Sequence, residues 1–439
     1  MGNPLRGLDP NLANSLYRLW LNPRLSRRSV LEFQERMMRR AIRWAYLRVP
    51  YYRRLFDGAG VGPGDIRAPE DLRKLPTTSK QAVKDQSLES VLVSGLDRRC
   101  LEKTTTTGST GEPMTLWRTR SDALLYFALR WRVMRSLGIR PSDLMARVAP
   151  RGTEEMPLSW RLLQRAGVYR TRPIHILEPP QAIARVVRDA RPDILTGDSG
   201  VIARISREFV PADSNGHPLR FLVTGSEVLT PNMREDIRRA FERPVYDTYA
   251  AEEFSVLAWE CRTTGLYHVA DDSVILEVLK DGRPAGPGET GETIVTGLLF
   301  RAMPFIRYRL GDQVRRGPDP CPCGAPFSTL ESITGRMTDY LIFPGGREVY
   351  ASSMAYVFHK RADWIRQYEV DQEKEDFVVL RAVSRAKPSR TEVDSLKKEI
   401  ALKLGPGVAF RLEFVDELDR GPGGKYRVFR SRVRSYYTD

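Results

Sequence analysis

The chain contains 439 residues, of which 41% are hydrophobic and 28% are charged, and this balance is typical of a folded globular protein rather than a disordered one. The formal net charge of +15 at pH 7 favours acidic partners, such as nucleotides, anionic substrates, nucleic acids or anionic surfaces, without choosing among them. No apolar run is long enough to cross a bilayer, and the N-terminus lacks the apolar segment of a secretory signal, so we expect a cytoplasmic protein. Four cysteines are too few for a disulfide framework, which predicts reduced thiols or metal ligands.

The first 57 residues carry much of the excess positive charge, with twelve arginines against four carboxylates. Within them, Phe33, Met37, Ala41 and Trp44 recur at helical spacing, with arginines on another face, which predicts an amphipathic basic helix. We expect this helix to pack on its own domain and to leave its arginines in water. A membrane-binding or partner-binding helix is the alternative.

The length predicts more than one domain. Prolines interrupt the first hundred residues repeatedly, which indicates a cap of short helices over residues 1–100. Helices and strands then alternate: helices are expected at 122–136, after Ser199 and after Thr230, and strands at 144–149, 194–196, 221–224 and 245–248. This alternation predicts a largely parallel α/β sheet, in which ligands lie at loops after the carboxyl ends of strands. Gly225–Glu227 and Tyr249–Glu253 are two such loops.

Shorter segments follow in the second half of the chain. Strands expected at 274–279, 293–296 and 305–309 predict a β subdomain over about 255–338. Beyond it we expect a strand at 340–343, a helix at 353–362, a strand at 376–380, a helix at 391–404 and a strand at 409–414. The predicted fold is therefore α/β: a large N-terminal domain, 1–338, with parallel sheets and a β subdomain, and a small mobile α+β C-terminal domain, 339–439.

The run Thr104–Pro113 is the most concentrated polar motif. Its glycines leave backbone N–H groups accessible and its hydroxyls add donors, which is the chemistry of a phosphate-binding loop. It is not a Walker loop, because Glu112 follows the second glycine where a Lys-Ser/Thr pair would be required. A flexible polar linker is the alternative.

With this loop, five further motifs occur in one order: Val49–Arg54 with Leu75–Lys80, Tyr249–Glu253, Tyr308–Asp312, Gly335–Asp339 and Gly424–Lys425. In these motifs the chain resembles the adenylate-forming (AMP-forming) ligase superfamily, and within it the phenylacetate-CoA ligase and CapK-like branch. The resemblance implies an enzyme that uses ATP and Mg²⁺ to activate a carboxylic acid, aryl or arylacetic, as acyl-AMP with release of pyrophosphate. It then implies transfer of the acyl group to CoA.

Other functions stay open at this point. The acceptor could instead be an amine or a carrier-protein thiol, as the CapK-like character indicates. A non-catalytic basic binding protein is a more distant alternative. We expect no specific nucleic-acid partner and no transmembrane segment, and since dimers occur in this branch, a homodimer is one expectation for the oligomeric state.

The resemblance also assigns roles to residues. Lys425 would bridge the carboxylate and the α-phosphate, Glu253 would help to bind magnesium, Asp312 would accept from the ribose hydroxyls, and Asp339 would be the hinge of the small domain. The residues expected to bind the nucleotide are Thr106, Thr107, Gly108, Ser109, Thr110, Gly111, Gly225, Ser226, Glu227, Asp247, Tyr249, Glu252, Asp312 and Arg336. By analogy, the acyl pocket would lie near Tyr126, Arg151, Gly197 and Ser226.

Three residues depart from the family pattern. Glu112 stands where many members carry lysine, and Ala250 replaces a common glycine. Glu252 stands where a serine or threonine usually contacts the α-phosphate. A carboxylate there repels phosphate unless magnesium or an arginine neutralises it.

A second constellation consists of Cys261, His268, Cys321 and Cys323, which fall within 63 residues. Thiolates and an imidazole suit tetrahedral zinc, and four protein ligands would make the site structural. The arrangement is also similar to Cys/His positions in some CapK-like relatives. Buried free cysteines are the alternative, because the Cys-x-Cys spacing is tighter than usual. Cys100 is expected to be structural.

Overall fold

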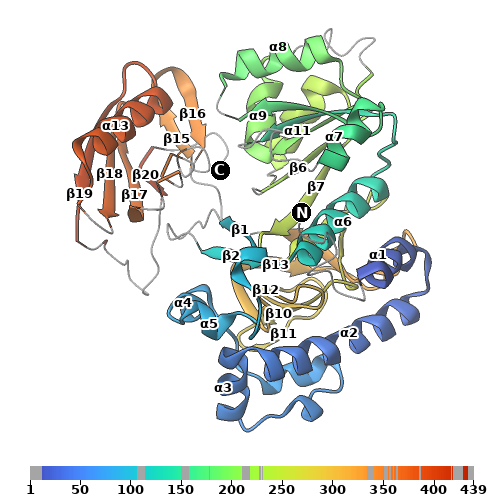
Figure 1. The fold of residues 1–439 in the computed structure, drawn as a ribbon. Coiled ribbons are helices and arrows are strands. Elements are labelled where there is room, and N and C mark those ends of the chain that lie inside the picture. The colour runs from blue at the N-terminus through green and yellow to red at the C-terminus, as the bar shows by residue number, and fades with distance from the viewer. Residues whose placement is uncertain are drawn as a thin grey trace. The chain divides into compact units, whose positions relative to one another are not determined.

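The structure is a computed structural model, and it describes residues 12–105, 114–149, 158–176, 178–209, 218–226, 229, 231–333, 340–350, 354, 357–358, 360–361, 364–384, 387–416, 418 and 429–433. The chain divides into two compact units (Figure 1). Unit 1 comprises Met1–Thr105, Thr115–Arg140 and Tyr246–Arg336, and unit 2 comprises Thr106–Met114, Pro141–Val245 and Met337–Asp439. The predicted domain division after residue 338 stays a prediction.

The helices of unit 1 are concentrated in its N-terminal part, as the prolines predict. They are α1 (Leu12–Leu21), η1 (Asn22–Arg24), α2 (Arg27–Arg48), α3 (Pro50–Gly58), η2 (Pro63–Asp65), η3 (Pro69–Lys74), α4 (Lys80–Lys84), α5 (Leu88–Val91), η4 (Arg98–Cys100) and α6 (Arg120–Ser136). Ser26 caps α2 by accepting from the Ser29 N–H. Phe33 and Met37 of α2 are buried while Arg36 and Arg40 are exposed, so the predicted packing of the basic helix on its own domain is confirmed.

The strands of unit 1 form an antiparallel arrangement in the order β11-β10-β12-β13-β14-β9-β8-β7. Their bounds are β7 (Val245–Ala251), β8 (Ser255–Glu260), β9 (Tyr267–Val269), β10 (Val274–Lys280), β11 (Arg283–Pro284), β12 (Thr290–Gly297), β13 (Tyr308–Arg316) and β14 (Thr329–Ile333). A separate hairpin pairs β1 (Glu102–Thr105) with β2 (Thr115–Arg118). The predicted strands at 274–279 and 293–296 are present as β10 and β12, whereas β8, β9, β11 and β14 are strands that the pattern did not predict.

Two predicted boundaries in unit 1 are wrong. The strand expected at 305–309 begins at Tyr308 and continues to Arg316. Arg307 has a φ of 46°, in the left-handed region, which interrupts extended backbone just before that strand. Tyr249–Ala251, expected in a loop, belongs to β7, because the strand turns directly into β8.

Unit 2 contains the predicted parallel α/β sheet, with strands in the order β6-β5-β3-β4. The strands are β3 (Leu144–Ala149), β4 (Arg170–His175), β5 (Ile194–Asp198) and β6 (Phe221–Gly225), and the helices are α7 (Leu158–Arg165), α8 (Pro180–Ala190), α9 (Ser199–Ser206) and α11 (Pro231–Phe241). Val148, Leu195 and Leu222 from the strands pack with Ile202 and Ile237 from the helices in one buried core. Apolar runs on buried parallel strands made this sheet readable from the sequence.

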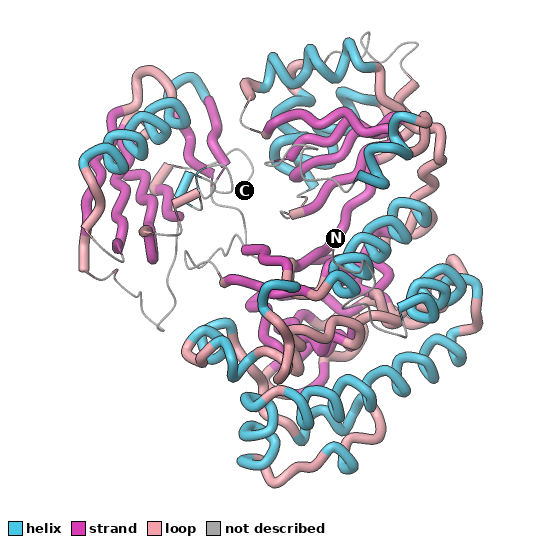
Figure 2. The backbone as a smooth tube through the Cα atoms, viewed as in Figure 1, coloured by secondary structure: helices cyan, strands magenta, loops and turns pink. Residues whose placement is uncertain are grey.

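The C-terminal part of unit 2 has its own core. It contains β15 (Tyr340–Phe343), η6 (Pro344–Gly346), β16 (Arg347–Tyr350), β17 (Ile365–Lys374), β18 (Phe377–Ser384), α13 (Arg390–Leu404), β19 (Ala409–Phe414) and β20 (Phe429–Ser431). Figure 2 shows the helix labelled α13 in Figure 1 running along the sheet β19-β18-β17-β20. Leu396 and Ile400 of α13 belong to one buried core with Val378 and Leu380 of β18. The helix expected at 353–362 lies largely outside the described residues.

Strand β17 was not predicted, because its sequence is polar. Glu369, Asp371 and Gln372 are nevertheless buried. Arg381 of the neighbouring strand donates to Glu369 at 2.8 Å, and such pairing makes the burial of a carboxylate tolerable. Among the helices in the described part of the chain, none combines the length and the apolar composition that crossing a bilayer requires.

Candidate active site and metal centre

The first cluster of predicted site residues in unit 1 joins the end of β7 to β13. The Tyr249 hydroxyl donates to Asp312 Oδ2 at 2.8 Å. Asp312 follows Gly311, whose φ of 78° suits glycine, at a point where the pairing of β12 and β13 shifts register. This irregularity lets an acidic side chain reach the end of β7. Two motifs that the sequence separates therefore meet in space.

Glu253 belongs to the same sequence motif as Tyr249, and it too is bonded to β13. The Tyr308 hydroxyl donates to Glu253 Oε1 at 3.2 Å. Burial raises the pKa of Glu253, while the positive charge of Lys80 and the Tyr308 hydrogen bond act in the opposite direction. A cation bound at this carboxylate would offset the same desolvation, so Glu253 fits a magnesium ligand.

Lys80 comes from the segment 75–80, which the sequence analysis placed in the family's N-terminal signature. Thr78 brings that segment to β13, because its N–H donates to the Arg307 carbonyl at 2.9 Å and its carbonyl accepts from the Arg309 N–H at 2.8 Å. The side chain of Thr78 also donates to the Ile306 carbonyl. These hydrogen bonds hold the segment 75–80 against β13 and so place Lys80 close enough to Glu253 for its charge to act on that carboxylate.

Glu252 has an arginine beside it. Arg118, at the end of β2, donates to the Glu252 backbone carbonyl, and its Nη2 lies 3.2 Å from Glu252 Oε2. The Arg118 guanidinium also lies 4.1 Å from the centre of the Tyr126 ring. An arginine that could neutralise the unusual carboxylate is therefore present in the same unit.

Asp247 bonds to residues of the neighbouring strands. It is buried, its Oδ2 accepts from the Tyr267 hydroxyl at 2.9 Å, and its N–H donates to Glu260 Oε2 at 2.9 Å. These bonds join β7, β8 and β9. Asp247 therefore stabilises the scaffold below Tyr249, and its contact with a nucleotide stays a prediction.

In unit 2, the predicted residues lie at the carboxyl edge of the parallel sheet. Gly225 ends β6 and is buried, and its carbonyl accepts from the Ser199 hydroxyl at 3.5 Å. Ser226 follows, exposed and with a φ of 66°. Near the end of β5, a Cβ on Gly197 would lie 3.1 Å from the Val148 side chain, so a larger residue there would need its neighbours to shift by a few tenths of an ångström. This is the edge at which doubly wound sheets bind ligands.

Several predicted residues lie outside the described residues: Thr106, Thr107, Gly108, Ser109, Thr110, Gly111, Glu112, Arg151, Glu227, Arg336, Asp339 and Lys425. Thr105 pairs with Thr115 across the β1–β2 hairpin, so the chain enters and leaves the 106–113 segment at one place.

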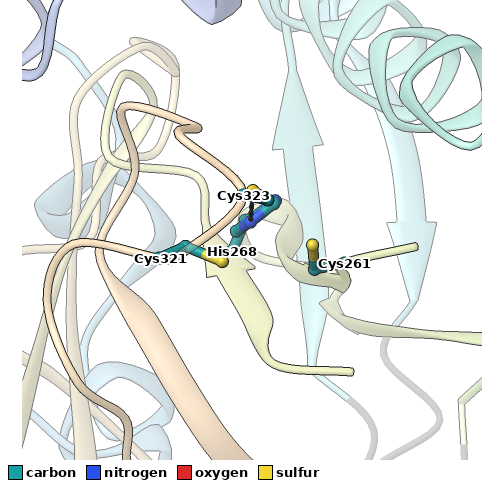
Figure 3. Close-up of side chains that lie close together, drawn as sticks. All are labelled: Cys261, His268, Cys321 and Cys323. Atoms are coloured by element: carbon teal, nitrogen blue, oxygen red, sulfur yellow. Dashed lines mark hydrogen bonds between the residues drawn. The ribbon is translucent and has the colours of Figure 1, made fainter. Parts of the chain in front are cut away.

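The four predicted metal ligands come together in unit 1 (Figure 3). Their ligand atoms all lie within 4.8 Å of one another, and Cys323 Sγ is 3.3 Å from His268 Nε2. Cys261 follows β8, His268 is on β9, and Cys321 and Cys323 lie in the connection between β13 and β14. Three of the four residues are buried and Cys323 is exposed.

The local chemistry fits a cation. Burial lowers the pKa of His268 to about 4, which leaves its imidazole neutral and able to ligate. Burial and the neighbouring thiols raise the pKa of Cys323 to about 12, as expected where several thiols crowd together without a positive charge. Burial also acts to raise the pKa of Cys261, but hydrogen bonds from Thr264 and Thr263 outweigh it and lower that pKa. With all four ligand atoms within 4.8 Å of one another, a single metal ion could contact them all, and three thiolates with an imidazole are a donor set that suits zinc.

Sequence reasoning missed three residues of the Glu252 and Glu253 surroundings: Arg118, Tyr308 as a hydrogen-bond donor, and Lys80 as a nearby charge. Lys80 and Tyr308 lie within motifs that the sequence analysis quoted, so their positions were available without their roles. Arg118 belongs to no motif, and its partner lies 134 residues away. Only the fold could reveal that contact.

Residues 341–432 match the CapK C-terminal domain family. The phenylacetate-coenzyme A ligase of Escherichia coli K12 is 29% identical over 321 residues, which cover 71% of this chain and 72% of that protein. Protein CapK of Staphylococcus aureus is 26% identical over 250 residues, covering 56% of this chain and 54% of that protein.

Among solved structures, 2-hydroxyisobutyryl-CoA ligase in complex with 2-HIB-AMP and CoA matches with a TM-score of 0.62 and 19% identity. The match covers 92% of this chain and 90% of that one. At this level of identity the likeness shows a shared fold, and it confirms the predicted fold class.

Proposed function

The chain belongs to the adenylate-forming ligase superfamily, in its phenylacetate-CoA ligase and CapK-like branch, and we propose that it activates a carboxylic acid with ATP and transfers the acyl group to CoA. One observation carries the proposal at the level of residues. The bond from Tyr249 to Asp312 and the bond from Tyr308 to Glu253 join two family motifs into one polar cluster.

The first half-reaction forms the acyl-adenylate. A carboxylate oxygen of the substrate attacks the α-phosphorus of ATP, and pyrophosphate leaves with the electrons of the broken P–O bond. Asp312, oriented by Tyr249, would accept from the ribose hydroxyls, and Lys425 would bridge the carboxylate and the α-phosphate. Glu253 would hold magnesium, which would neutralise charge on the phosphates. The loop 106–111 would bind the β- and γ-phosphates, and Arg336 would contact the nucleotide.

The second half-reaction consumes the adenylate. The CoA thiolate attacks the acyl carbon, and AMP leaves with the electrons of the broken C–O bond. Movement of the C-terminal domain about Asp339 would exchange the residues that face the acyl group. An aryl or arylacetic acid is the proposed substrate class, supported by the similarity to phenylacetate-coenzyme A ligase.

A second candidate keeps the adenylation step and changes the acceptor to an amine or a carrier-protein thiol. The match of residues 341–432 to the CapK C-terminal domain supports it. The resemblance implies that the C-terminal domain turns between the two half-reactions, so a difference in that domain would bear on the acceptor more than on the activation of the acid.

We also propose that Cys261, His268, Cys321 and Cys323 hold a structural zinc. Four protein ligands leave no coordination position for a substrate, so the metal would join β8, β9 and the connection before β14 without entering the reaction. None of the four cysteines is in a disulfide bond, which supports a reducing, cytoplasmic location. A homodimer is proposed on the resemblance alone, and the molar mass from light scattering tests it.

The test is ATP–pyrophosphate exchange over a panel of aryl, arylacetic, fatty and amino acids, beside a Lys425→Ala variant. We expect exchange that depends on one class of acid and is lost in the variant. Product analysis with CoA, and with an amine in its place, then identifies the acceptor. Absence of both exchange and ATP binding would reject the ligase function and favour a non-catalytic basic binding protein.

A further inference from the structure

Arg118 occupies a position that the family resemblance does not assign. It is the last residue of β2, three residues after Thr115, where the chain leaves the predicted phosphate loop. Its side chain is only 13% exposed. A charge buried to this extent needs a compensating partner.

The contacts of Arg118 reach three elements. Its guanidinium donates to the backbone carbonyl and to the carboxylate of Glu252 at the end of β7, and it stacks on Tyr126 of α6. Tyr126 in turn is joined to the start of β8, because its carbonyl accepts from the Ser255 hydroxyl at 3.0 Å. Arg118 thereby fixes the backbone immediately before Glu253.

The ion pair between Arg118 and Glu252 also changes the net charge next to Glu253. Glu252 and Glu253 are adjacent carboxylates, and only Glu253 has a proposed role in binding magnesium. The Glu252 side chain is 39% exposed, so its charge would face an approaching polyphosphate. An arginine in contact with Glu252 removes most of that net charge.

We propose that Arg118 is a positioning residue for adenylation: it neutralises Glu252 and holds the Glu252 backbone, so that Glu253 keeps its orientation and ATP can approach. This inference rests on the proposed function. It explains how the chain retains a carboxylate where a hydroxyl residue is expected. It also predicts that Arg118 matters only while Glu252 is present.

The experiment is a double-mutant cycle on the full-length protein, with ATP–pyrophosphate exchange as the measurement. Arg118→Gln is expected to raise the KM for ATP about tenfold or more, with a smaller change in kcat, because an uncompensated carboxylate opposes phosphate binding. In the Glu252→Thr background, the same change at Arg118 is expected to alter KM by less than about threefold. Arg118→Lys should restore only part of the affinity, since a compact ammonium cannot lie flat over the Tyr126 ring as the planar guanidinium does.

Arg130→Gln is the matched control. Arg130 also lies against Tyr126, at 5.9 Å from the ring centre, and its Nη1 donates to the Tyr126 hydroxyl. Among the described residues it forms no hydrogen bond or ion pair with Glu252, so the KM for ATP should stay unchanged. Should Arg118→Gln fail to fold, Arg118→Lys in the two backgrounds supplies the same cycle.

The outcomes are separable. Exchange in the wild-type protein with equal losses from Arg118→Gln in both backgrounds would overturn the inference, because a purely structural role does not depend on the Glu252 charge. An unchanged KM in Arg118→Gln would overturn it too. Absence of exchange in the wild-type protein would instead overturn the proposed function, and the inference with it.

Discussion

The Cys/His cluster and the polar cluster around Asp312 lie in the same compact unit but are built in different ways. In the first, four ligand atoms lie within 4.8 Å of one another and three of the four residues are buried. In the second, Asp312, Glu252 and Glu253 are only half-buried, and each is oriented by a tyrosine or an arginine. A closed set of ligands suits a structural metal, whereas oriented and accessible carboxylates suit a substrate.

The largest effect is expected from a substitution in the Cys/His cluster. Cys321→Ser removes a buried ligand, so bound zinc should fall from about one per chain to nearly none. The midpoint of thermal unfolding should fall by about 10 °C, because loss of a structural metal is among the most destabilising changes. Elemental analysis and calorimetry measure the two quantities.

Cys100→Ser is the control for that experiment, since Cys100 is exposed and lies outside the cluster. Its zinc content and unfolding midpoint should match the wild-type protein. Equal zinc in both variants would contradict the proposed metal centre.

Substitutions in the polar cluster around Asp312 should change activity rather than stability. Glu253→Gln is expected to lower kcat at least about 100-fold, because a neutral amide is a poor magnesium ligand. The unfolding midpoint should not fall, since the burial that raises the pKa of Glu253 also penalises its charge. Exchange rates over a range of Mg²⁺ concentrations measure the effect. Glu70→Gln, at an exposed site of the same unit, should leave them unchanged.

Asp271, three residues after His268, should make the free energy of unfolding depend on pH. Burial raises the pKa of Asp271 to about 7, although its Oδ2 accepts from the Ser328 N–H at 2.6 Å and Arg27 lies nearby; Gln34 and Asp319 also face it. The folded state therefore binds a proton that the unfolded state releases near pH 4. Stability should fall as pH rises from about 4 to 7, by up to about 1.4 kcal/mol per unit, and then level off.

Asp271→Asn should remove this slope, because asparagine does not titrate. Urea unfolding of both proteins at pH 5, 6, 7 and 8 gives the comparison. Identical slopes in the two proteins would show that another group is responsible for the pH dependence.

The smallest expected effect concerns orientation within the polar cluster around Asp312. Tyr249→Phe removes the hydroxyl that donates to Asp312, so the KM for ATP should rise about three- to tenfold. Steady-state kinetics measure it, with exposed Tyr17→Phe as the control. An unchanged KM would mean that Asp312 is oriented by other contacts.

Local sequence signals predicted much of the fold. Apolar runs located β3, β5 and β6, and the capping box Ser389-x-x-Glu392 accompanies the helix that begins one residue before the predicted one. Such signals fail where burial depends on distant partners. β17 was missed because Glu369 is polar, and only Arg381 of the next strand allows it to be buried.

The two clusters also differ in how far the sequence alone could predict them. Three thiols and an imidazole within 63 residues suit a single metal ion, so residue type and closeness in the chain together predicted which four side chains would meet. Carboxylates have many uses, and the resemblance was needed to select Asp312 and Glu253. Even then, nothing in the sequence connected Glu252 with Arg118.

The sequence by itself determined the strand and helix types, the candidate metal ligands and the family motifs, because each depends on residues close together in the chain or on their chemistry. The tertiary structure decided which charges compensate one another. Tyr249 meets Asp312, Tyr308 meets Glu253, and Arg118 meets Glu252 across gaps of 63, 55 and 134 residues. Electrostatic compensation acts over a few ångströms of space and is indifferent to separation along the chain, so only the folded molecule can specify it.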